Sequence, residues 1–135
     1  MSLIQWNEYF SVGVKAMDQQ HMKFIDMLNA CLQAQERGQL HEITFDTLKD
    51  MMSYLNRHFG DEEKMMRDNG YPDVDSHIQM HRNFVAKTND FLDRYVSERG
   101  AIAEDMLGFL KDWFINHIVK IDKQYTDYMH DKGIR

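Results

Sequence analysis

The sequence predicts an all-α fold: an up-down-up-down antiparallel four-helix bundle with an irregular N-terminal arm. Apolar residues recur at intervals of three and four along four long segments, which is the period of a helix with one buried face. Turn-forming residues are sparse, with one proline and seven glycines in 135 residues, and no alternating β-branched run of useful length occurs. The connections between segments are short, so neighbouring helices should run antiparallel.

The length of the chain is that of one compact domain. A chain of 135 residues buries a sizeable core without disulfides, and no repeat, low-complexity tract or linker divides it. We therefore expect a single domain over residues 1–135. Within it the pattern predicts an arm at 1–17 and helices at about 18–37, 43–68, 74–99 and 102–131.

Local signals predict how the arm meets the first helix. The arm contains Trp6 and Phe10, and it is too aromatic to be a solvated tail. Asp18 is expected to cap the helix by accepting hydrogen bonds from its free amides, and Gly38 is expected to end it. The buried side of this helix would carry His21, Phe24, Ile25, Leu28 and Leu32.

The other three helices are separated by breakers. Residues 69–72, with the sequence Asn-Gly-Tyr-Pro, end the second helix. Asp73 or Asp75 begins the third helix, which ends near Gly100, and the fourth helix ends near Gly133. The inward stripes of these helices contain many of the eleven methionines, which we interpret as flexible core fillers rather than copper ligands.

Composition restricts the location and the partners of the protein. The single cysteine, Cys31, cannot form an internal disulfide and is interpreted as a small buried side chain in a reducing compartment. No secretory signal and no apolar run long enough for a membrane span is found. With 22 acidic and 16 basic side chains the net charge is −6, which repels phosphate backbones. We expect a cytoplasmic monomer that binds no nucleic acid.

Five of the seven histidines lie on the apolar stripes of the predicted helices. One buried imidazole is commonly satisfied by a hydrogen bond within a core, but five would need polar partners that these stripes do not offer. The two other histidines, His41 and His130, lie at helix edges and are expected to be solvated. The five on the stripes are His21, His58, His77, His81 and His117.

Two carboxylates, Glu62 and Asp122, share these inward faces. A buried acid is normally excluded or shifts its pKa, so a shared cation would explain both. Five imidazoles and two acids are too many ligands for a tetrahedral zinc, and they suit two bridged transition ions of higher coordination number. The predicted ligands of this dinuclear site are His21, His58, Glu62, His77, His81, His117 and Asp122.

The spacing of His117 and Asp122 is less regular than that of the other ligands. Residues five apart lie about 140° apart around an ideal α-helix. Either a local π-bulge brings the two together, or Asp122 approaches the metals from another side. We favour the bulge.

Four motifs carry a resemblance to a known family. They are Trp6-x6-Gly13-x4-Asp18-x2-His21, His58-Phe59-x2-Glu62-Glu63, Tyr71-Pro72-x4-His77-x3-His81 and His117-x4-Asp122-x2-Tyr125. Over nearly its whole length the chain resembles the hemerythrins, and in particular the single-domain bacterial hemerythrins. All seven ligand positions match the family pattern.

The resemblance implies two iron ions per chain, joined by an oxo or hydroxo bridge. One iron would be held by His77, His81 and His117, and the other, with one position open, by His21 and His58. Glu62 and Asp122 would bridge them. Iron is implied by the resemblance alone, because manganese would accept the same donors.

The function that the resemblance implies is reversible binding of dioxygen, for storage, transport or delivery, without catalysis. An imidazole-rich site stabilises high-valent iron less than a carboxylate-rich one, which favours reversibility. Three alternatives remain open: a di-iron oxidase or peroxidase, a nitric-oxide scavenger, and an oxygen or redox sensor that acts through a partner. The protein that would receive the oxygen is also left open.

Residues around the ligands have weaker assignments. Gln20 and Tyr125 are candidates to hold the free N–H of an imidazole, and Asp18 could orient His21 as well as cap its helix. Glu63 and Lys64 are expected to face solvent. Candidate lining residues of an oxygen pocket, for each of which ordinary core packing is an equal explanation, are Leu28, Phe59, Trp113, Phe114 and Val119.

Overall fold

The computed structural model describes residues 3–39, 45–98 and 100–135, without the side chains of 96–98, 100–102 and 119. All regular structure in these ranges is helical. The long helices are α1 (Lys15–Glu36), α2 (Phe45–Asp68), α3 (Val74–Glu98) and α4 (Gly100–Asn116). Shorter elements are η1 (Glu8–Phe10), the π-helical turn η3 (His117–Ile121), the 3-10 segment η4 (Asp122–Tyr125) and α5 (Thr126–Asp131).

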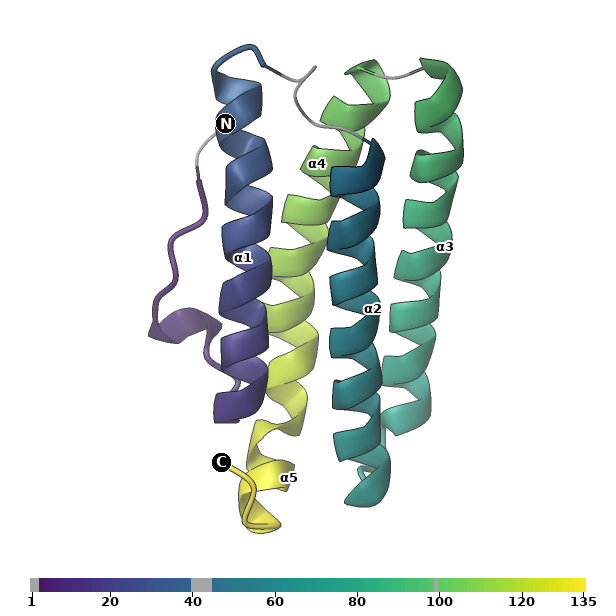
Figure 1. The fold of residues 1–135 in the computed structure, drawn as a ribbon. Helices are drawn as coiled ribbons and strands as arrows, with labels where there is room; N and C mark the ends of the chain where they lie inside the picture. Colours follow the sequence, from purple (N-terminus) through teal and green to yellow (C-terminus); the bar gives the residue numbers. More distant parts are fainter. Residues whose placement is uncertain (1–2, 40–44, 99) are drawn as a thin grey trace.

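The four long helices form the predicted bundle. Helices α1 and α3 each pack against both α2 and α4, and Figure 1 shows that successive helices run in opposite directions. Their apolar stripes meet along the bundle axis, where Leu28, Leu55 and Met106 are among the fully buried side chains. Cys31 is buried as a free thiol. The predicted fold class is therefore confirmed.

The helix boundaries differ from the prediction at two places. Helix α1 begins at Lys15, after an extended Val14 whose side chain makes no cap. The last predicted helix begins at Gly100, and its winding changes three times after Asn116, from α to π, then to 3-10 and back to α, so it is not one continuous α-helix. Residues 43 and 44, the predicted start of the second helix, and His41 lie outside the described residues.

Asp18 joins the arm to α1 instead of capping the helix. It lies in the first turn, and its carboxylate accepts hydrogen bonds from Ser11 Oγ at 2.6 Å and from the Val12 amide at 2.8 Å. Further along, Ile4 and Asn29 exchange two hydrogen bonds of 2.9 and 2.7 Å. The arm is therefore fastened to α1 at two points, and Figure 1 shows it running beside that helix.

Helix α5 covers the junction between the arm and α1. Thr126 Oγ1 donates to the Val12 carbonyl at 2.7 Å, and His130 Nε2 donates to the Gly13 carbonyl at 2.7 Å. His130 is only partly exposed, so the expectation of a solvated side chain was wrong. Gly13 has a φ of +72°, and a Cβ atom there would lie 2.8 Å from both Thr126 Cγ2 and His130 Nε2.

Replacing Gly13 with alanine should lower the free energy of unfolding by about 3 kcal/mol, as measured by chemical denaturation. The left-handed backbone costs an L-residue roughly 1–2 kcal/mol, and the overlap with α5 adds about 1–3 kcal/mol. Gly38→Ala is the matched control, because Gly38 has a φ of +70° but nothing lies within 4 Å of its Cβ position. Equal losses in the two variants would contradict the proposed contact with α5.

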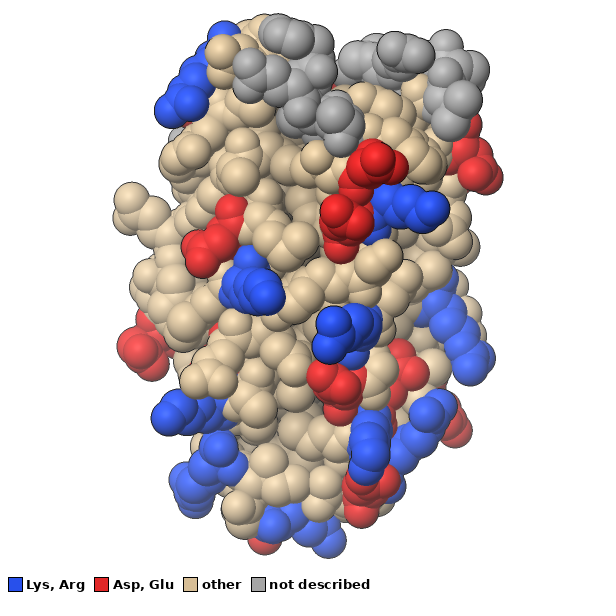
Figure 2. Space-filling model, in the orientation of Figure 1, with Lys and Arg blue, Asp and Glu red and all other residues tan. Residues whose placement is uncertain are grey.

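The face of the molecule shown in Figure 2 carries both signs of charge. On the face shown in Figure 2, lysine and arginine side chains are interspersed with aspartate and glutamate, as on the solvated faces of amphipathic helices. In the described part of the chain, no helix combines the length and the apolar character needed to cross a bilayer.

Candidate metal centre

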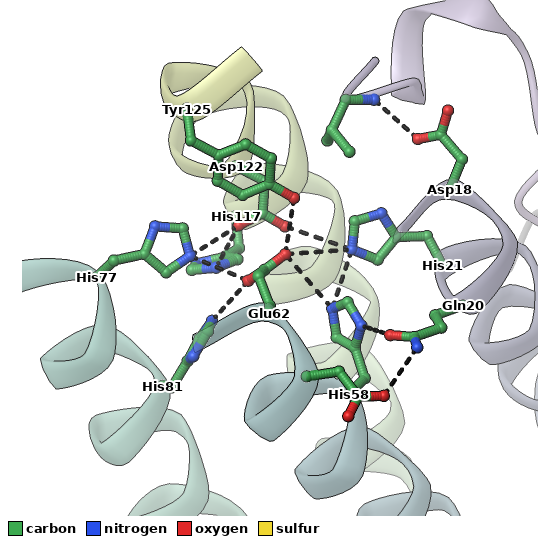
Figure 3. A network of polar contacts seen from close by, with 12 residues as sticks. Asp18, Gln20, His21, His58, Glu62, His77, His81, His117, Asp122 and Tyr125 are labelled. Atoms are coloured by element: carbon green, nitrogen blue, oxygen red, sulfur yellow. Dashed lines mark hydrogen bonds and ion pairs between the residues drawn. The ribbon is translucent and has the colours of Figure 1, made fainter. Parts of the chain in front are cut away.

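The seven predicted ligand residues come together inside the bundle (Figure 3). Helix α1 contributes one of them, α2 and α3 two each, and the segment after α4 the last two. All seven are buried, with exposed fractions between 0% and 5%. In chain order they are His21, His58, Glu62, His77, His81, His117 and Asp122.

The change of winding after Asn116 places Asp122 in the cluster. The Asp122 amide donates to the carbonyl of His117, five residues earlier, which is the hydrogen bond of a π-helix. The wider turn brings the two side chains to one side of the helix, with His117 Nε2 2.8 Å from Asp122 Oδ1. Of the two predicted alternatives, the π-bulge is confirmed.

Glu62 lies between two groups of imidazoles. Its Oε1 atom is 3.1 Å from Nε2 of both His77 and His81. Its Oε2 atom is 3.7 Å from His58 Nε2 and 3.9 Å from His21 Nε2. The carboxylate therefore presents one oxygen to each group.

Asp122 repeats this arrangement from the other side. Its Oδ1 atom is 3.0 Å from His77 Nε2, on the same side as His117, and its Oδ2 atom is 3.4 Å from His21 Nε2. The potential ligand atoms thus form two overlapping groups, each with its atoms within 4.8 Å of one another. Glu62 and Asp122 belong to both groups, which is the arrangement of two carboxylates that bridge a pair of cations.

Several polar atoms of the cluster lack a hydrogen-bond partner among the described residues. Both Asp122 oxygens and the Nε2 atoms of His81 and His117 are buried without an aligned hydrogen bond among the described residues. His21 Nε2 and His58 Nε2 lie 3.0 Å apart, so at most one proton can be shared between them. Each unsatisfied buried group costs about 1–3 kcal/mol. Cations that accept these lone pairs would remove the cost, and the nitrogen and oxygen donors suit iron or manganese.

Outer hydrogen bonds orient two of the imidazoles. His58 Nδ1 donates to Gln20 Oε1 at 2.6 Å, and His81 Nδ1 donates to Glu63 Oε2 at 2.9 Å. Because a carboxylate only accepts, a proton on His81 Nδ1 satisfies this contact and leaves Nε2 as the ring atom that can bind a cation in the cluster. Partners of this kind commonly set the tautomer of a metal-binding histidine.

These contacts correct three of the weaker sequence-based assignments. Glu63 is 18% exposed and reaches across to His81 instead of facing solvent. Tyr125 donates to Glu62 Oε2 at 2.9 Å, so it holds a carboxylate and not an imidazole. Asp18 is bonded to the arm, and it does not hold His21, whose Nδ1 has no hydrogen bond among the described residues. Gln20 alone contacts an imidazole as predicted.

The protonation of the cluster reflects burial and the acids together. Burial lowers the pKa of His58 to about 4. Burial also opposes the charged form of His77, but hydrogen bonds and charges from Asp122 and Glu62 raise its pKa to about 9. Burial would raise the pKa of both acids, yet the surrounding imidazoles hold it below the ordinary value. The acids are therefore anions that can serve as metal ligands.

Aromatic rings enclose the cluster. Phe59 stacks on His81 with 3.9 Å between ring centroids, Trp113 stacks on His117 at 4.3 Å, and Phe114 meets His21 edge-on at 5.7 Å. Leu28 is fully buried about two turns of α1 beyond His21. The side chain of Val119, the fifth candidate lining residue, lies outside the described residues.

Comparisons with known proteins agree with this geometry. The family model of the hemerythrin HHE cation-binding domain matches residues 12–128. The bacteriohemerythrin of Methylococcus capsulatus is 31% identical over 126 residues, covering 93% of this chain and 95% of the relative. The myohemerythrin of Theromyzon tessulatum is 28% identical over 127 residues, covering 90% and 89%. A wild-type hemerythrin structure aligns with a TM-score of 0.83 at 30% identity, covering 93% of this chain and 97% of that one.

Proposed function

Because the chain belongs to the hemerythrin family, we propose that its buried cluster holds two iron ions and binds dioxygen reversibly. Non-haem iron and oxygen carriage are the properties that the family suggests. In this proposal the protein stores, transports or delivers oxygen in the cytoplasm as a monomer and performs no catalysis.

The observation that carries the proposal is the unequal division of the donor atoms. His77, His81 and His117 would hold one iron, and His21 and His58 the other, with Glu62 and Asp122 bridging them. The second group has one imidazole fewer, so an iron held by His21 and His58 would have fewer protein ligands and would be the one to take up a gas molecule. A ferrous pair would supply the two electrons that dioxygen takes up and returns.

The residues of the chain provide the conditions for reversibility. Phe59, Trp113 and Phe114 place rings against three of the imidazoles, and they exclude water from the buried cluster. Tyr125 is completely buried and fixes one oxygen of Glu62. Burial raises the pKa of the Tyr125 hydroxyl well above its ordinary value, so it stays protonated and continues to donate.

Anaerobic reduction followed by oxygen titration tests the proposal. We expect two irons per chain by metal analysis, and an oxygenated absorption spectrum that returns to the reduced form under argon. Oxidation that argon does not reverse would contradict oxygen carriage. Turnover of added peroxide or nitric oxide by the same sample would favour the enzymatic alternatives instead.

A further inference from the structure

Two imidazoles of the cluster have outer partners of different charge. His81 Nδ1 donates to the Glu63 carboxylate at 2.9 Å, whereas His58 Nδ1 donates to the neutral Gln20 amide at 2.6 Å. His81 belongs to the group with three imidazoles, and His58 belongs to the group with two. The two proposed metal positions therefore differ in the charge of the residue that holds one of their imidazole ligands.

The Gln20 side chain and the His81 ring are each held in place by a further contact. The Gln20 amide nitrogen donates to Asp61 Oδ2 at 3.0 Å, which turns the amide oxygen toward His58 (Figure 3). Glu63 extends from α2 to α3 in the wall of a surface groove of about 410 Å³, which Arg82 also lines. The Phe59 ring lies flat against His81 at 3.9 Å and prevents this imidazole from tilting away.

A carboxylate partner changes the electronic character of an imidazole. It draws the Nδ1 proton toward itself and increases the electron density that Nε2 donates to a metal. Greater donation stabilises the higher oxidation state and lowers the reduction potential, whereas an amide acceptor does so less. Glu62 and Asp122 belong to both groups of ligands, whereas Glu63 contacts an imidazole of one group only.

We propose that Glu63 is a positioning residue, which orients His81 and lowers the reduction potential of the iron that His81 would hold. This inference rests on the proposed function, because it requires iron at the cluster. Glu63 does not touch the metal or the gas in this proposal, and it acts through the imidazole.

The test compares reduction potentials of the iron-loaded protein, measured by spectroelectrochemical titration. Glu63→Gln keeps an acceptor oxygen but removes the charge, and it should shift the potential to a more positive value. Glu63→Asp keeps the carboxylate, and its reduction potential should lie closer to that of the wild type than the potential of Glu63→Gln does. Asp68→Asn is the control for long-range charge, since Asp68 lies on α2 with 57% of its side chain exposed.

A double variant that conserves the net charge tests the other outer partner, Gln20. Gln20→Glu combined with Asp61→Asn moves a carboxylate onto His58 without changing the net charge. The expected result is a more negative potential than in the wild type. An unchanged potential in this variant would contradict the proposed mechanism.

NMR of the metal-free protein tests directly whether Glu63 fixes the His81 ring. Ring ¹⁵N NMR should show His81 protonated on Nδ1 in the wild type, and Glu63→Ala should lose this preference. The same variant should bind iron about 10- to 100-fold more weakly. An unchanged tautomer in Glu63→Ala would overturn the orienting role.

The two proposals fail in different ways. A wild-type protein without two irons overturns the proposed function, and this inference with it. The inference about Glu63 fails alone if the wild type binds two irons and oxygen reversibly but Glu63→Gln has the same reduction potential as Asp68→Asn.

Discussion

Replacing Glu62 with glutamine is expected to reduce the metal content from two ions per chain to one or none. Glu62 is completely buried, and its two oxygens face the two groups of imidazoles. An amide offers one acceptor oxygen, and its NH2 would point hydrogens at an imidazole Nε2 or at the Tyr125 hydroxyl. Because loss of an outer partner alone costs about 10- to 100-fold in metal affinity, loss of a shared ligand should cost at least about 100-fold. Metal analysis after anaerobic loading and dialysis measures the effect.

The matched control is the same chemical change on the outside of the bundle. Glu104 is exposed on α4, so Glu104→Gln should retain both metals. Glu62→Gln should still fold, because the change removes a buried charge from the metal-free protein, and circular dichroism checks the helix content. Two tightly bound irons in a folded Glu62→Gln variant would show that Glu62 is not a bridging ligand.

The sequence was sufficient for the fold class and for the composition of the cluster. Polar side chains such as His77 and His81 stand on an apolar stripe, and a helix must turn that stripe inward whatever its neighbours are. The spacing of His117 and Asp122 even indicated the π-helical turn, since five residues fit no ordinary helical face. These predictions succeeded because they depend on the period of one helix.

The predictions that failed depend on contacts between elements. Glu63 lies next to a stripe residue, and whether it meets water or His81 is decided by the position of α3 relative to α2. His130 and Asp18 have ordinary local signals, but both are engaged by the arm as it folds back on the bundle. The donor set likewise accepts more than one transition metal, so iron follows from the family resemblance and not from the residues alone.

Stripping the metals with a chelator is expected to lower the free energy of unfolding by several kcal/mol. A ligand that binds only the folded state stabilises it in proportion to the logarithm of its concentration over its dissociation constant, about 4 kcal/mol at a thousandfold excess. The stripped protein also retains the unsatisfied atoms of Asp122, His81 and His117. Thermal unfolding with and without added metal measures the difference.

The stripped protein should also be most stable near pH 6.5. The pKa of His77 is raised from 6.5 to about 9, so its stabilisation is complete below pH 6.5 and is lost as the pH rises through 9. The pKa of His58 is lowered to about 4, so the unfolded chain binds more protons between pH 4 and 6.5, and stability falls as the pH falls there. Each shift corresponds to about 3 kcal/mol.

Bound metal should abolish the loss of stability that the stripped protein shows as the pH rises from 6.5 to 9. When a cation occupies the His77 lone pair, no proton remains to be lost between pH 6.5 and 9, so the loaded protein should keep nearly constant stability over that range. Glu62→Gln is the informative comparison, because its stability should respond less to added metal than that of the wild type at every pH. A stripped wild-type protein that is more stable at pH 9 than at pH 6.5 would mean that His77 does not hold its proton between Glu62 and Asp122. Glu62 and Asp122 would then lack this internal partner in the metal-free protein, and their charges would depend more strongly on bound cations.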